Sequence, residues 1–130
     1  ISRLVALLEK QNSQVIVTPE ALLTDNAIEM RIVIRNDSDS TVTIEHSSGQ
    51  KFDFALLDAN RNVVYRWSAD KLFIAMLTTT EIKAGETLVL SDTLSGDAYT
   101  AIKDKIVWMQ AFVTGTAPFL YTDGYEIPLR

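Results

Sequence analysis

The only histidine of the chain, His46, is followed directly by Ser47 and Ser48, a combination that raises the question of nucleophilic catalysis. A serine nucleophile needs a base within hydrogen-bond reach and a third group that orients this base. Neighbouring residues on a strand point to opposite faces, so His46 and Ser47 are not expected to meet. We therefore expect His46 to be an ordinary surface or loop residue.

Two pairs of aspartates could hold a cation or hydrolyse a glycoside. Asp37 and Asp39 resemble the start of a calcium loop, but the glycine and distal glutamate that such a loop requires are missing, which favours a solvated turn. Asp53 and Asp58 could form a glycosidase pair, but five positions apart on one strand they face opposite sides. Asp53 lies between two aromatic residues, so we expect its carboxylate to hold a backbone or arginine partner.

The composition argues against several other kinds of chemistry. The 130 residues fit one domain, and the absence of cysteine removes disulfides, thiolate metal sites and thiol nucleophiles. No nucleotide-binding loop or zinc-ligand spacing is found. The net charge of −5 argues against nucleic acid, and no apolar run approaches the roughly 20 residues of a membrane span. We expect a non-enzyme that uses no metal or cofactor.

Aromatic and apolar side chains are the remaining candidates for contact with a partner. Trp67 and Trp108 could stack on carbohydrate, but their apolar same-face neighbours favour core positions. An apolar patch at helical spacing, which would be a partner site if left exposed, comprises Leu72, Phe73, Met76 and Leu77. In a second candidate loop, residues 115–124, Pro118 favours an extended backbone that would offer Phe119 to an apolar pocket. The alternative is that Phe119 and Tyr121 cap the end of the domain.

Alternation of period two dominates the elements that must position these residues. Residues 28–35 alternate aliphatic and charged side chains, which is typical of a half-buried strand. Other strands are expected at 15–18, ending at Pro19, and at 41–46, 52–56, 63–67, 87–93, 105–114 and 125–129. Seven to eight short strands predict an all-β, immunoglobulin-like antiparallel β-sandwich over residues 15–130. Residues 1–14 are expected to form a short helix or tether. The predicted core includes Ile32, Ile34, Phe52, Phe54, Val64, Leu88, Trp108 and Phe112.

Turn residues connect these strands. The turn after Asn36 and the glycine turn at 83–86 are polar. In the hairpin loop 58–62, which contains no glycine, we expect Asn60 or Asn62 to adopt a positive φ.

Several of these residues together resemble a family motif. They are Ser48-Gly49-Gln50-Lys51-Phe52-Asp53-Phe54, Tyr65-Arg66-Trp67-Ser68, Phe73 and Lys83-Ala84-Gly85-Glu86. Residues 36–93 thereby resemble the bacterial intracellular proteinase inhibitor family (the BsuPI domain). The resemblance implies a β-sandwich without enzymatic machinery that binds a protein partner, a serine protease of subtilisin type. The alternative is an interaction or structural domain of an envelope protein without inhibitory activity.

The motif residues are expected to be structural, because Gln and Asp side chains near a strand start can bond a neighbouring loop and Ser68 can cap the turn after Trp67. This structural set is Gly49, Gln50, Phe52, Asp53, Phe54, Trp67, Ser68 and Gly85. The partner-binding candidates are Trp67, Phe73, Met76, Pro118, Phe119 and Tyr121. The family name implies the cytoplasm, whereas a signal peptide removed before Ile1 would imply export to the periplasm or cell envelope.

Overall fold

The computed structural model describes residues 14–130, so the predicted helix or tether lies outside the described residues except for Gln14. The predicted all-β antiparallel sandwich is confirmed: nine strands form the described part, with only short helical segments. The elements are β1 (Val15–Leu23), β2 (Ala27–Asn36), β3 (Val42–His46), β4 (Phe52–Asp58), β5 (Val63–Arg66), η1 (Trp67–Asp70), β6 (Thr78–Ile82), β7 (Thr87–Ser95), α2 (Gly96–Thr100), β8 (Ile106–Val113) and β9 (Tyr125–Pro128). Among residues 14–130, no helix is long and apolar enough to cross a membrane.

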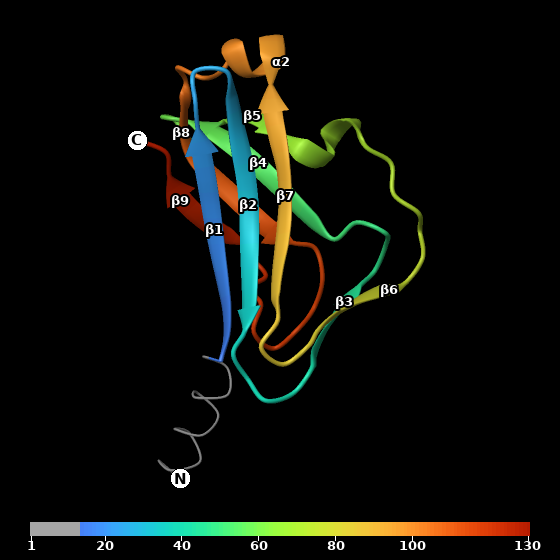
Figure 1. Cartoon of the computed structure of the whole chain (residues 1–130). Helices are drawn as coiled ribbons and strands as arrows, with labels where there is room; N and C mark the ends of the chain where they lie inside the picture. Colours follow the sequence, from blue (N-terminus) through green and yellow to red (C-terminus); the bar gives the residue numbers. More distant parts are fainter. Residues whose placement is uncertain (1–13) are drawn as a thin grey trace.

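Two sheets face each other and enclose the core. One has the order β1-β2-β7 and the other β5-β4-β8-β9, while β3 and β6 form a separate two-stranded ribbon beside them (Figure 1). The alternation read in residues 28–35 points its aliphatic side chains inward, as predicted. The fully buried residues of the inner faces include Ile28, Met30, Ile32, Ile34, Phe54, Leu56, Met109 and Ala111. Phe52, Val64 and Leu88 are partly buried and pack against this core.

Strand β1 extends beyond its predicted end. We expected it to stop at Pro19, but it continues to Leu23, with Pro19 opposite Ile32 of β2. Because β1 is the edge strand of its sheet, the missing amide hydrogen of Pro19 leaves the ladder intact on the β2 side.

The prediction that Trp108 and Phe112 are core residues is wrong. Both faces of β8 are apolar, and the inner face carries Met109, Ala111 and Val113, so the two aromatic rings lie on the outer face of the sheet. Guanidinium groups cover them: Arg61 lies 5.4 Å from the centroid of Trp108, and Arg66 lies 5.9 Å from that of Phe112. The face of Trp108 is thus occupied by a side chain of the same domain.

Arg61 also corrects the expected hairpin geometry. It is Arg61, with φ 65°, that adopts the left-handed conformation rather than Asn60 or Asn62. The carboxylate of Asp58 accepts the amide hydrogens of Asn60 and Asn62, both at 2.9 Å, which leaves Arg61 at the tip of the turn. Its guanidinium bonds Glu126 at 2.5 Å and lowers the pKa of that carboxyl.

A buried asparagine joins the turns at one end of the sandwich. The Asn36 amide group donates to the carbonyls of Ser40 and Ile82, both at 2.9 Å. The backbone carbonyl of Asn36 accepts the amide hydrogen of Gly85. The φ of Gly85, 77°, requires the conformational freedom of glycine in the turn before β7. The turn between β2 and β3 is therefore fixed to the turn between β6 and β7.

Candidate functional site

The most exposed apolar surface of the described residues is the loop 71–77, named here the apolar loop. Relative exposure reaches 100% for Leu72, 82% for Leu77, 61% for Ile74 and 60% for Met76. Despite the helical spacing of these residues, the segment forms no helix and runs without regular structure between η1 and β6 (Figure 1). Contiguous apolar side chains left in solvent are typical of a surface that binds a partner.

A buried carboxylate holds Ser68 of η1, three residues before the apolar loop begins. One oxygen of Asp53 accepts the backbone amide of Ser68 at 3.1 Å, and the other accepts its hydroxyl at 2.6 Å. Arg66 adds an ion pair at 3.6 Å. A buried charge needs such partners. Asp53 therefore links the part of the motif on β4 to the part at Ser68, just before the loop.

Stacked aromatic rings support the loop from below. Phe52 contacts Phe54 edge-on, with ring centroids 5.5 Å apart, and stacks on Trp67 with centroids 4.4 Å apart. The ring centroid of Trp67 lies 6.0 Å from that of Phe73 in the loop. The ammonium of Lys71 lies 4.4 Å from the centroid of the Trp67 ring and donates to the Trp67 carbonyl at 3.0 Å. The rings connect the core to the loop.

Trp67, predicted from the sequence both as a core residue and as a partner-binding candidate, lies in the core. It is buried, at 8% relative exposure, between Phe52 and Phe73, so its ring supports the loop rather than contacting a partner. Its indole nitrogen donates to Asp92 of β7 at 2.5 Å, which joins the loop base to the opposite sheet. Burial, together with the nearby carboxylates of Asp92, Asp70 and Asp53, raises the pKa of Tyr65 beside this base.

The second half of the loop rests against the turn that contains Gly49. The amide of Gly49 donates to the carbonyl of Ile74 at 2.9 Å, and a Cβ on Gly49 would lie 2.8 Å from Cγ1 of Ile74. The hydroxyl of Thr78, where the loop enters β6, donates to the carbonyl of Ser48 at 2.7 Å. Only glycine allows the loop to approach this closely.

His46 differs from its expected surface position. It is buried at 2% relative exposure, with Nδ1 2.9 Å from the carbonyl of Thr114 and Nε2 2.7 Å from the hydroxyl of Thr80. A carbonyl only accepts, so Nδ1 donates to Thr114, while Nε2 and the Thr80 hydroxyl form the second hydrogen bond. His46 thereby joins β3, β6 and the end of β8. The sequence signal was the alternation of Val42 and Ile44, which continues inward to His46.

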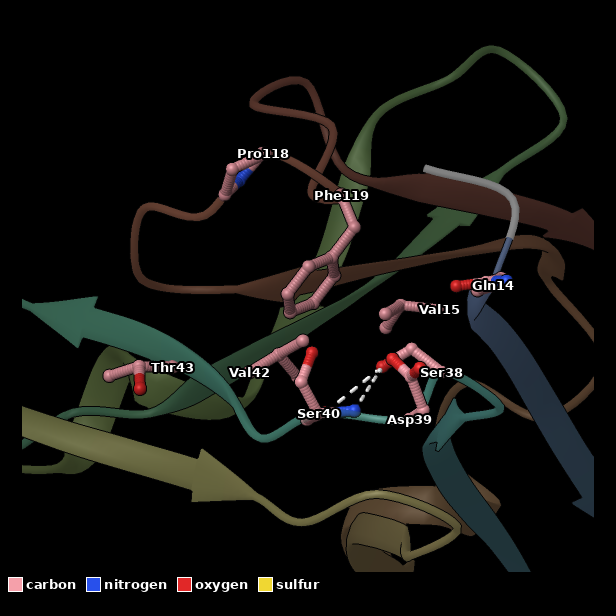
Figure 2. A pocket seen from close by; sticks show the side chains of 9 residues that line it. All are labelled: Gln14, Val15, Ser38, Asp39, Ser40, Val42, Thr43, Pro118 and Phe119. Atoms are coloured by element: carbon pink, nitrogen blue, oxygen red, sulfur yellow. Dashed lines mark hydrogen bonds between the residues drawn. The ribbon is translucent and has the colours of Figure 1, made fainter. Parts of the chain in front are cut away.

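The remaining candidates lie in the loop 115–124, apart from the apolar loop (Figure 1). Figure 2 shows the ring of Phe119 pointing into an open pocket beside Val42 and Val15, and Phe119 packs against the core. Pro118 is exposed, and Tyr121 is 72% exposed and stacks on Tyr125 at 5.3 Å. Burial raises the pKa of Tyr125. Phe119 would have to give up its contacts with the core to fill a partner's pocket.

Within residues 14–130, no group of three or more acidic, histidine or cysteine side chains is arranged to hold a metal ion. In the same part of the chain, no buried polar side-chain atom lacks a hydrogen-bond partner. The feature that the described residues offer at this site is an exposed apolar loop held by buried polar and aromatic residues.

The fold and the site define a β-sandwich domain whose buried motif presents one apolar loop. A family model described as intracellular proteinase inhibitor (BsuPI) matches residues 15–105, and the chain belongs to this family. The resemblance read from residues 36–93 is confirmed, and the match extends beyond that range on both sides.

One solved structure shows similarity at the level of the fold. A penta-heme cytochrome c552 from Thermochromatium tepidum is 10% identical, with a TM-score of 0.55 over 93% of this chain and 41% of that chain. The present chain thus spans less than half of that protein's length. A DUF1425 family member from Shewanella sp. pv-4 is 12% identical, with a TM-score of 0.47 over 79% of both chains. Among curated proteins, no match was found.

The close approach at Gly49 leads to a first prediction. Gly49→Ala should lower the free energy of unfolding by about 1–3 kcal/mol, because the new methyl group overlaps the Ile74 side chain. Urea denaturation measures this loss. In an Ile74→Ala background the same substitution should cost less than half as much, since the overlapping atoms are gone. Equal costs in the two backgrounds would contradict the proposed contact.

Proposed function

We propose that the chain is a non-enzymatic binding module that inhibits a serine protease of subtilisin type, with the apolar loop as the inhibitory contact. The family match supports an inhibitor role. The observation that carries the choice of contact is the combination of exposed apolar side chains with anchors on both sides of the loop.

Anchoring matters because a protease cleaves a flexible exposed loop as a substrate. A loop already held in the bound conformation loses less conformational entropy on association, which favours tight binding. Here Asp53 fixes the start, while Gly49 and Ser48 fix the second half. Hydrogen bonds and stacked rings thus take the place of a disulfide as a brace, because the chain has no cysteine.

The direct test is a titration of purified protein against a panel of serine proteases that includes a subtilisin. Residual protease activity is measured against the molar ratio of the two proteins, and the integrity of the chain is followed by mass spectrometry. We expect activity to fall to near zero close to stoichiometry while the chain stays intact. Digestion as an ordinary substrate by every protease would contradict inhibition and would favour the non-inhibitory domain.

A matched pair of variants tests the choice of loop. Exchanging Leu72, Met76 and Leu77 for serine leaves the anchored residues in place and should weaken inhibition by about 100-fold or more, because one main contact anchor contributes about 2 kcal/mol or more and the other two side chains add smaller amounts. The control is Pro118→Ser combined with Tyr121→Ser, two exposed positions of the second loop, which should leave the inhibition constant unchanged. The reverse pattern would move the contact to residues 115–124.

A further inference from the structure

The side chains of the apolar loop fall into two groups. Phe73 is 36% exposed and leans on Trp67, and the Cγ1 atom of Ile74 lies against Gly49, so both are engaged with the domain. The free group comprises Leu72, Met76 and Leu77. The loop therefore offers a partner aliphatic side chains, while its one aromatic ring is used internally.

The residues on both sides of Leu72 are held by contacts with η1. The amide of the preceding residue, Lys71, donates a hydrogen bond to the carbonyl of Ser68 at 3.1 Å, and its ammonium donates one to the carbonyl of Trp67 at 3.0 Å. The following residue, Phe73, packs on Trp67. Leu72 thus stands between two anchored neighbours with a completely exposed side chain.

Met76 and Leu77 are held less firmly. They follow Ile74 across a bend at residues 75–76. In the described structure, none of the residues 75–77 makes a backbone hydrogen bond. A partner that binds these two side chains has to order the backbone as well, which reduces their contribution to affinity.

We infer that Leu72 is the specificity-determining residue of the loop and that it enters a partner pocket that accepts a leucine-sized aliphatic side chain. The inference rests on the proposed inhibitory function and deepens it. Leu72 contributes the full transfer of an exposed side chain out of water, from a position whose two neighbours are already held. Phe73 would have to give up its contact with Trp67 to take the same role.

The test compares inhibition constants against a subtilisin that the unmodified protein inhibits. Leu72→Ala should weaken inhibition by about 10- to 100-fold, the equivalent of burying one leucine side chain. Leu72→Asp should weaken it further, whereas Leu72→Met should stay within about 10-fold because its volume and polarity are similar. The melting temperature should not change, since Leu72 is fully exposed. Met76→Ala and Leu77→Ala are the controls, each with a loss below about 5-fold.

Two outcomes overturn the inference and differ in what they leave standing. If the unmodified protein inhibits the protease and either control variant loses as much as Leu72→Ala, then Leu72 does not determine specificity, although the inhibitory function stands. If the unmodified protein inhibits no protease of the panel, both the function and the role of Leu72 are wrong. A largest loss at Leu72, with retention by methionine, supports the inference.

Discussion

Replacing Phe54 by alanine is expected to lower the free energy of unfolding by about 3–5 kcal/mol. Phe54 is fully buried on β4 and meets Phe52 edge-on, so truncation removes its contacts and leaves a cavity in the core. Chemical denaturation followed by tryptophan fluorescence measures the loss. The matched control is Phe73→Ala, a partly exposed ring, which should cost clearly less. A cost below about 1 kcal/mol at Phe54 would contradict its central place in the core.

The second large effect is expected at Asp53. Asp53→Ala should cost about 3 kcal/mol, because the amide and hydroxyl of Ser68 and the cation of Arg66 lose a buried acceptor. The same change should weaken protease binding, since the start of the apolar loop is released. Denaturation and a binding titration on the same variant measure both quantities.

Ser68→Ala provides the control for the interaction between Asp53 and Ser68. It removes the hydroxyl and keeps the backbone bond to Asp53, so its cost should be smaller, and a double-mutant cycle should give a coupling energy of about 0.5–3 kcal/mol. An Asp53→Ala protein with an unchanged melting temperature but no partner binding would contradict the structural role. Asp53 would then be a direct contact.

Much of the fold could be predicted from the sequence because the strands bury one face. Ile32 and Ile34 are fully buried and alternate with neighbours that are partly buried or exposed, so only one face of this strand can point into the core. β8 is apolar on both faces, so alternation does not determine which face is inside. Trp108 could be placed only once Arg61 was known to lie over its ring. The positive φ at Arg61 follows from the arrangement of the loop, in which Asp58 binds the amides of Asn60 and Asn62 on either side of it.

The separate parts of the candidate site could be predicted from the sequence, but not how these parts come together. The motif indicated that Gly49, Asp53 and Ser68 are structural, and the run 72–77 was evidently apolar. Nothing in local sequence shows that Gly49 lies against Ile74, because that contact joins segments 25 positions apart through the tertiary fold. The inward position of His46 did carry a signal, since it continues the period of Val42 and Ile44.

Hydrogen exchange of the complex with a subtilisin tests the central claim most directly. No backbone hydrogen bond protects the amides of residues 72–77 within the described structure, so they should exchange rapidly in the free protein. Bound protease should slow exchange across residues 71–77 and leave 115–124 unchanged. Protection at 115–124 with continued rapid exchange at 71–77 would contradict the account.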